Sequence, residues 1–302
     1  MKAKLALTVS AALSLGLAAC AETAALPTVA PSPAPAPAAD APAPLPPLRA
    51  MLDCLPSDAA LLAAHRGTGT GVGAPENSLS GLEALIEAGV LMAEIDIAKI
   101  ADGTLISFHD GVWEEKSSGT GPVVATPREA FDRIRLRLEE GGTVGGERVP
   151  LFTDMLEAAK GRIYLELDFK TSADIGRAVQ MVRDAGMSDH VVLIASSAEE
   201  AKTLKAFGDE FVLSLPYQSR KRSAGDRQGV WVGGRWREDA QAELRRRHYT
   251  IGSQWTRRPD ENKRAQSRLD IIATDQPLRG GPIAGLKNRA AFDACVAQAA
   301  LD

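Results

Sequence analysis

Short apolar runs alternate with amphipathic helical patterns between residues 61 and 274. Eight runs have the length and apolar content of buried strands, at 61–65, 91–97, 104–109, 162–169, 190–195, 211–216, 250–254 and 270–274. Helical patterns lie between most of them, at 78–88, 151–160, 173–185, 198–207, 237–247 and 259–267. This alternation predicts βα units that build a parallel sheet.

Two stretches depart from the alternation. Only residues 98–103 connect the second and third runs, which leaves no room for a helix. Residues 110–149 are polar and Gly-rich, with a short helical pattern at 128–137, and 229–235 could be a further short strand. We therefore expect an α/β fold, a (β/α)8 TIM barrel with an insertion (residues 111–149) after the third strand. An open doubly wound sheet is the alternative. Long loops in compact domains are usually functional, so the insertion is expected to cover or shape a site.

The first 49 residues have a different character and contain nine of the 18 prolines. Lys2 and Lys4 precede an apolar run at 5–17, which is too short to cross a hydrocarbon core of about 30 Å but suits a signal peptide. Ala-Pro repeats at 26–48 cannot pack a core and predict a semi-extended spacer. We divide the chain into a signal peptide (1–19), a tether (20–49) and one folded domain (50–302), whose length suits a barrel.

The apolar run ends in Leu17-Ala18-Ala19-Cys20, which resembles the lipobox of bacterial lipoproteins. The resemblance implies acylation of Cys20 and a lipid-anchored protein on the periplasmic side of a bacterial cell envelope. The alternative is cleavage after Ala21, which would give a soluble periplasmic or secreted protein. Cys54 and Cys295, near the two ends of the folded part, could form a disulfide in such an oxidising compartment or remain buried thiols.

Composition narrows the classes of partner. Three cysteines exclude a disulfide-dense scaffold. The net charge of −4 hides a basic region at 218–268, which is either a contact for something anionic or a solvated helical face. The chain has no broad basic domain, so we expect no nucleic-acid partner, and no protein partner is inferred.

Charged side chains inside barrel strands need an explanation, because both faces of such a strand are covered. They gather near the carboxyl ends of four runs, where barrel enzymes place their chemistry: His65, Arg66, Glu94, Asp96, His109, Asp110, Glu166, Asp168 and Lys170. Facing carboxylates repel one another unless a hard cation such as Ca²⁺ or Mg²⁺ binds them. Imidazoles transfer protons near neutral pH. His190 and His248 lack neighbours like those of His65 and are assigned to structure.

A series of motifs runs through this pattern in a fixed order. It comprises His65-Arg66-Gly67, Pro75-Glu76-Asn77-Ser78, Glu94-Ile95-Asp96, His109-Asp110, Gly119-Thr120-Gly121, Asp168-Phe169-Lys170, Trp255-Thr256 and Thr274-Asp275-Gln276-Pro277. The series resembles the glycerophosphodiester phosphodiesterase family, a branch of the phospholipase-C-like phosphodiesterase barrels, and covers most of residues 61–277.

The resemblance implies a metal-dependent hydrolase that cleaves small glycerophosphodiesters into sn-glycerol 3-phosphate and an alcohol. It implies His65 and His109 as general acid and base, in an order that stays open, and Arg66 and Lys170 as phosphate-binding residues. It further implies that Glu94, Asp96 and Asp168 hold one Ca²⁺ or Mg²⁺, with Glu166 as a possible substitute ligand. Glu76, Asn77 and Trp255 would line the substrate pocket.

Two other functions remain open. A lysophospholipase D or sphingomyelinase-D-like reaction would be favoured by a long apolar groove formed by residues 111–149. A non-catalytic envelope-binding barrel is the second, and the complete set of charged side chains argues against it. The headgroup preference stays undecided.

Overall fold

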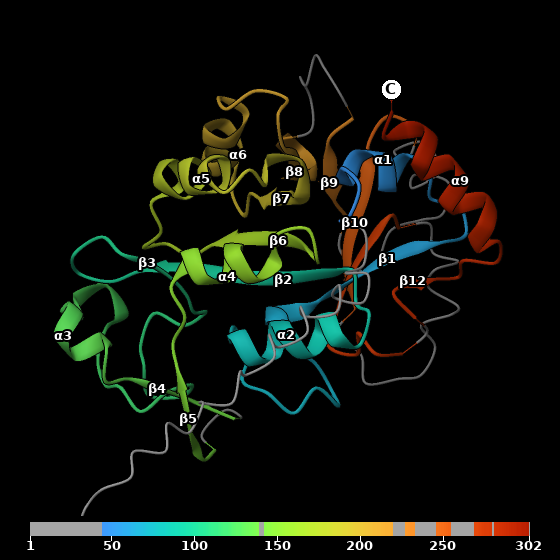
Figure 1. Ribbon diagram of the computed structural model, residues 1–302. Helices are drawn as coiled ribbons and strands as arrows, with labels where there is room; N and C mark the ends of the chain where they lie inside the picture. Colours follow the sequence, from blue (N-terminus) through green and yellow to red (C-terminus); the bar gives the residue numbers. More distant parts are fainter. Residues whose placement is uncertain are drawn as a thin grey trace, which may run out of the picture. The chain divides into compact units, whose positions relative to one another are not determined.

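A closed barrel of eight parallel strands forms the centre of the molecule (Figure 1). The computed structural model describes residues 44–138, 142–219, 227–232, 246–254, 269–279 and 281–301. The barrel strands are β1 (Ala60–Ala64), β2 (Met92–Lys99), β6 (Tyr164–Phe169), β7 (Val191–Ile194), β8 (Val212–Pro216), β9 (Gly229–Trp231), β10 (Tyr249–Gln254) and β11 (Ile271–Thr274). Strand β1 pairs with both β11 and β2, which closes the ring. The predicted TIM barrel is confirmed, and the open sheet is excluded.

The third predicted strand is not a barrel strand. β3 (Leu105–Ser107) pairs with β2 in the antiparallel direction, at the edge of the sheet. The six-residue connection at 98–103 allows only a hairpin, because a parallel crossover needs a dozen or more residues. The eighth barrel strand is instead β9, from the uncertain run at 229–235. The insertion therefore follows β3 in the chain but lies between the second and third barrel strands.

Among the described residues, four helices cover the outside of the barrel: α2 (Leu79–Glu87), α4 (Phe152–Ala159), α5 (Ile175–Asp184) and α6 (Ala198–Lys205). Their apolar faces pack against the outward residues of the strands in one continuous buried cluster. Helix α2 begins where Ser78 Oγ accepts a hydrogen bond from the backbone N–H of Gly81, which satisfies a group that the helix leaves unpaired. The helix predicted at 259–267 and most of that at 237–247 lie outside the described residues.

The two ends of the domain meet through elements that the sequence patterns did not predict. Helix α1 (Leu48–Asp53) packs near α9 (Arg289–Ala299), and β12 (Ile283–Ala284) pairs with β1. Cys54 and Cys295 form a disulfide with a Cα–Cα distance of 5.8 Å, so the structure has the bridge and not the pair of buried thiols. The first two residues of α1 belong to the predicted tether, and Leu48 is fully buried. Cys20 lies outside the described residues, among which no helix is long and apolar enough to cross a membrane.

The insertion packs around a small buried cluster that it shares with Ala98, Ile100, Ile106 and Phe108, at β2 and β3. It contains α3 (Arg128–Phe131) and a hairpin of β4 (Arg135–Arg137) and β5 (Val144–Arg148), so the helical pattern at 128–137 divides into a helix and a strand. Trp113 is fully buried there and lies 4.6 Å from Phe108 between ring centroids. Because this cluster is separate from the barrel core, the insertion folds beside the barrel in Figure 1.

Candidate active site

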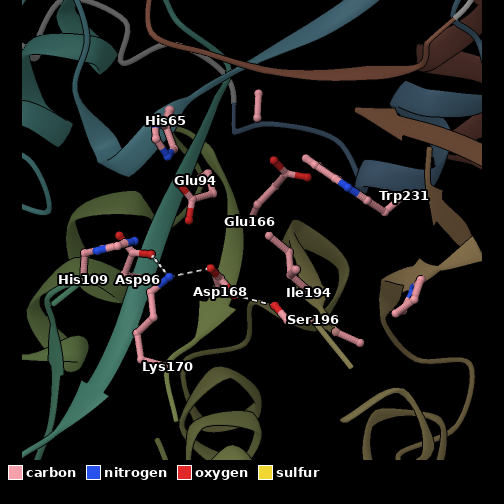
Figure 2. Close-up of a pocket in the computed structure, with 13 residues that line it drawn as sticks. His65, Glu94, Asp96, His109, Glu166, Asp168, Lys170, Ile194, Ser196 and Trp231 are labelled. Carbon is pink, nitrogen blue, oxygen red and sulfur yellow. Dashed lines mark hydrogen bonds and ion pairs between the residues drawn. The ribbon is translucent and has the colours of Figure 1, made fainter. Parts of the chain in front are cut away.

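A cavity of about 360 Å³ opens at the carboxyl ends of the barrel strands (Figure 2). One part of its wall is charged, and the other is mainly apolar. It is lined by His65, Glu94, Asp96, His109, Glu166, Asp168, Lys170, Ile194, Ala195, Ser196, Pro216, Trp231 and Ala273. No described residue of 111–149 lines this cavity, so the expected cover over the site does not form part of its wall.

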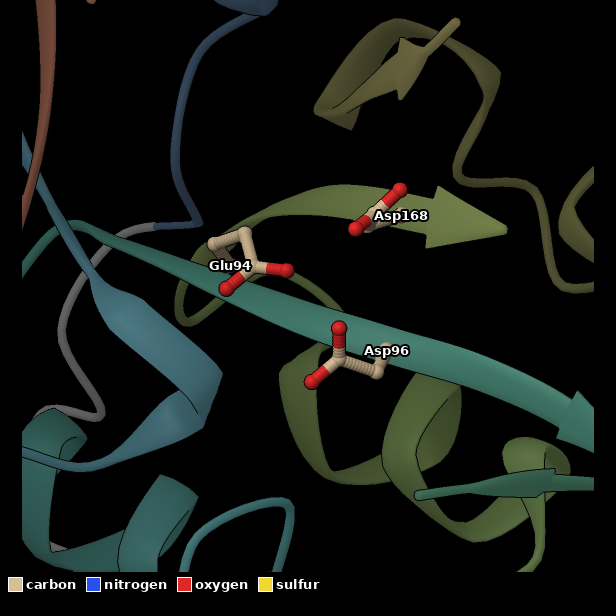
Figure 3. Close-up of side chains that lie close together, drawn as sticks. All are labelled: Glu94, Asp96 and Asp168. Atoms are coloured by element: carbon tan, nitrogen blue, oxygen red, sulfur yellow. The ribbon is translucent and has the colours of Figure 1, made fainter. Parts of the chain in front are cut away.

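Strand register brings three carboxylates together (Figure 3). Strands β2 and β6 pair Asp96 with Asp168 and Glu94 with Glu166. Residues two apart in a strand share a face, so all four side chains point into the barrel. Oxygens of Glu94, Asp96 and Asp168 lie within 4.8 Å of one another. Glu166 is not part of this group.

The negative charge of this group is only partly compensated. Lys170 Nζ lies 2.7 Å from Asp96 Oδ1 and 2.6 Å from Asp168 Oδ2. Burial, together with the charge of Asp96, raises the pKa of Glu94 well above its usual value. A divalent cation would relieve this repulsion, and carboxylate oxygens are the ligands that Ca²⁺ and Mg²⁺ prefer. The donor set therefore fits the predicted cation.

Asn77 holds the central carboxylate in place. Its Nδ2 donates to Asp96 Oδ2 at 2.6 Å, and its Oδ1 accepts from the backbone N–H of Asp96 at 2.9 Å and from Ser107 Oγ at 3.0 Å. Its backbone φ is 54°, a conformation that Asn adopts more easily than most residues. Asn77 was predicted to line the substrate pocket; the structure places it behind Asp96, outside the cavity wall.

His65 is presented by a tight turn at the end of β1. The turn η1 (His65–Gly67) places Arg66 at a φ of 55°, and the backbone N–H of Arg66 donates to Glu94 Oε2 at 2.8 Å. His65 Nδ1 lies 2.8 Å from Asp275 Oδ1. Burial lowers the pKa of His65, while Asp275 opposes that shift. The imidazole therefore favours its neutral form, with the Nδ1 proton directed at Asp275.

His109 reaches the site through the hairpin. Because β3 runs back along β2, the chain after Ser107 returns to the level of Asp96, where Phe108 N–H donates to the Asp96 carbonyl. Asp110 Oδ1 lies 2.6 Å from His109 Nδ1, and Arg66 Nη2 lies 2.9 Å from His109 Nε2. A guanidinium only donates, so His109 Nε2 is the acceptor and Nδ1 carries the proton.

The remaining predicted residues are distributed around this centre. Arg66 Nη1 forms an ion pair with Glu76 at 3.0 Å, and Lys116 of the insertion also contacts Glu76, which lines a neighbouring groove. Trp255 lies outside the described residues. Sequence reasoning missed Trp231, although the short apolar run at 229–235 was its signal. It also gave no role to Asp275.

The mouth of this (β/α)8 barrel holds two histidines with carboxylate partners, three clustered carboxylates and a lysine. Such a set at this end of the barrel is the active centre of a barrel enzyme. Residues 65–259 match the glycerophosphoryl diester phosphodiesterase family. A glycerophosphodiester phosphodiesterase of Caldanaerobacter subterraneus subsp. tengcongensis is 21% identical over 164 residues, which cover 52% of this chain and 67% of the relative.

Solved structures share the fold. A glycerophosphoryl diester phosphodiesterase from Parabacteroides distasonis superposes with a TM-score of 0.64 at 20% identity, covering 82% of this chain and 90% of that one. An Oleispira antarctica phosphodiesterase in complex with sn-glycerol-3-phosphate gives a TM-score of 0.60 at 18% identity, covering 76% and 96%. The chain belongs to the glycerophosphoryl diester phosphodiesterase family and is a phosphoric diester hydrolase.

Proposed function

We propose that this enzyme hydrolyses glycerophosphodiesters to sn-glycerol 3-phosphate and an alcohol, with one divalent cation at Glu94, Asp96 and Asp168. The observation that carries the proposal is the single cavity that joins these carboxylates to Lys170, His65 and His109. The family match and the Oleispira relative bound to sn-glycerol-3-phosphate support the substrate class.

The histidines act as a proton-transfer pair. Each imidazole has a carboxylate at Nδ1, Asp275 for His65 and Asp110 for His109, so each would exchange protons through Nε2. One removes the proton of the attacking hydroxyl, which is either water or the glycerol hydroxyl next to the phosphate, and the other protonates the leaving alkoxide. If the glycerol hydroxyl attacks, the product is a cyclic phosphate, which water then opens. Both carboxylates orient the rings and stabilise the imidazolium that forms.

The cationic side chains compensate the phosphate charge. Lys170 reaches into the cavity, and Arg66 lies against His109, so both would face a phosphodiester held there. A bound divalent cation would act as a Lewis acid on a phosphate oxygen. Asn77, behind Asp96, keeps that carboxylate from turning away from the cavity.

Hydrolysis of glycerophosphocholine, glycerophosphoethanolamine and lysophosphatidylcholine tests the activity. The purified chain should release glycerol phosphate with Ca²⁺ or Mg²⁺ and lose the activity with EDTA. His65→Ala and His109→Gln should each lose about 10²–10⁴-fold in kcat, whereas the control His190→Gln, whose ring hydrogen-bonds to Asp189 and the Leu45 carbonyl, should remain active. Activity that survives both EDTA and His65→Ala contradicts the mechanism. Release of choline from lysophosphatidylcholine would favour the lysophospholipase D reaction instead.

We also propose that the enzyme is exported and anchored to a bacterial envelope membrane through acylated Cys20. The motif Leu17-Ala18-Ala19-Cys20 and the Ala-Pro spacer support this location. A single acyl chain gives only marginal binding, so stable anchoring needs more than one. Labelling with palmitate should disappear in Cys20→Ala, and equal labelling of both proteins would contradict the anchor.

A further inference from the structure

Glu166 is a buried carboxyl group in the cavity that the proposed chemistry does not use. Only 1% of the residue is exposed, and its Oε1 has no hydrogen-bond partner among the described residues. Figure 2 shows its side chain extending toward the indole of Trp231, away from Asp168 on the same strand. A buried polar atom without a partner is costly, so a site of this kind points to a group that supplies the missing hydrogen bond.

A second unpaired polar atom lies in the same layer of the barrel. Glu166 is in register with Val192 on β7, whereas Ser214 on β8 is in register with Ile194, two residues further along β7. Neighbouring strands of a barrel are staggered, so residues on alternate strands lie in one layer when their register differs by two residues. Glu166 and Ser214 differ by this amount. Ser214 Oγ is also buried without a partner in the described part of the chain.

On the side of β7 and β9 the cavity wall next to this polar layer is apolar. The same offset places Ile194 and Trp231 in the next layer toward the mouth, where both line the cavity. Asp168 stands two residues beyond Glu166, about 6.6 Å further along β6 in the direction of the mouth. A substrate phosphate at the three carboxylates would therefore have one ester arm pointing inward, past Trp231 to Glu166.

The chemistry of the inner layer fits a hydroxyl group. An alcohol can donate to a carboxyl oxygen and accept from a serine hydroxyl, and its carbon chain can pack on an indole. A quaternary ammonium group has no N–H, so it cannot supply the hydrogen bond that Glu166 Oε1 lacks among the described residues. Glycerol is the arm common to the proposed substrates, whereas the headgroup varies and is better placed toward the open mouth.

We propose that Glu166 and Ser214, with Trp231 above them, form a subsite for the terminal hydroxyl of the glycerol arm. The inference rests on the proposed function for the identity of the ligand. It assigns to Glu166 a role in substrate specificity in place of the metal-ligand role that the sequence left open.

Binding of two phosphate monoesters tests the subsite without requiring turnover. The probes are sn-glycerol 3-phosphate and 2-hydroxypropyl phosphate, which lacks only the terminal hydroxyl. Titration calorimetry with the purified full chain and Ca²⁺ should show that the wild type prefers glycerol 3-phosphate by about tenfold or more. Glu166→Leu should weaken the binding of glycerol 3-phosphate but not that of 2-hydroxypropyl phosphate. The Kd values of the two probes should then lie within about twofold of each other.

Other variants keep the test decisive. If Glu166→Leu fails to fold, the smaller change Ser214→Ala tests the same subsite. It should reduce the preference for glycerol 3-phosphate. Val192→Ala removes interior volume without removing a polar group and should leave the ratio unchanged. Glu94→Gln should weaken Ca²⁺ binding, whereas Glu166→Leu should weaken it much less.

Three results would overturn the subsite: a wild-type ratio near one, an equal loss of both probes in Glu166→Leu, or a loss of Ca²⁺ affinity in Glu166→Leu as large as in Glu94→Gln. A chain that discriminates between the probes but hydrolyses no glycerophosphodiester would keep the subsite and refute the proposed function.

Discussion

Replacing Asn77 removes the support of the central carboxylate. The side chain is 1% exposed and makes three hydrogen bonds, one of them to the carboxylate of Asp96. A bond to a charged group contributes about 1.5–3 kcal/mol and a neutral bond about 0.5–1.5 kcal/mol. Asn77→Gly should therefore lower the free energy of unfolding by about 2.5–6 kcal/mol, a large share of the stability of an ordinary domain.

The backbone conformation of Asn77 provides an internal control. Its φ of 54° suits glycine, whereas alanine pays about 1–2 kcal/mol in that region, so Asn77→Ala should be less stable than Asn77→Gly by about that amount. Equilibrium unfolding in guanidinium chloride with EDTA measures both values without a contribution from bound cation. A loss below about 1 kcal/mol in Asn77→Gly would refute the reasoning, because it would mean that the three bonds add almost nothing to stability.

Three further results are expected. The disulfide Cys54–Cys295 closes a loop of 241 residues, so replacing both cysteines by serine should cost about 5 kcal/mol in denaturant unfolding; an unchanged midpoint would contradict this. Millimolar Ca²⁺ or Mg²⁺ should raise the Tm relative to EDTA, and a shift that persists in Asp96→Ala would place the cation elsewhere. Burial lowers the pKa of His65, so the unfolded chain binds that proton more readily and stability should fall as the pH drops below about 6.5. Asp275→Asn removes interactions that raise this pKa and should extend the fall to lower pH, as unfolding midpoints across that range would report.

Much of the barrel could be predicted because its signal is local. Buried parallel strands are apolar on both faces, and the covering helices are amphipathic, so both leave a pattern in adjacent residues. β3 and β9 were harder to assign, because a local pattern does not reveal the direction of strand pairing and is weak in a very short strand. A run such as Leu105–Ser107 is equally apolar in a parallel or an antiparallel pair, and Gly229–Trp231 is too short to stand out.

The candidate site divides along a similar line. Glu94, Asp96, Asp168 and Lys170 were predictable because charge inside an apolar strand is conspicuous and a two-residue spacing fixes the face. The carboxylate partners of the two histidines were not predictable from the sequence, apart from Asp110, which is adjacent to His109. Asp275 lies 210 residues from His65 in the chain, and only closure of the barrel between β1 and β11 brings them together.

Residue types and spacing thus specified the barrel class, the strand ends that carry the chemistry and the pair of cysteines at the domain ends. Tertiary structure decided which strands close the ring, that Asn77 supports Asp96, and that Glu166 lies apart from the other three carboxylates. The physical reason is that strand pattern records which face a side chain takes, whereas the stagger between strands sets its depth in the barrel. Glu166 and Asp168 share a face of β6 but lie at different depths, and only Asp168 groups with Glu94 and Asp96 of the neighbouring strand.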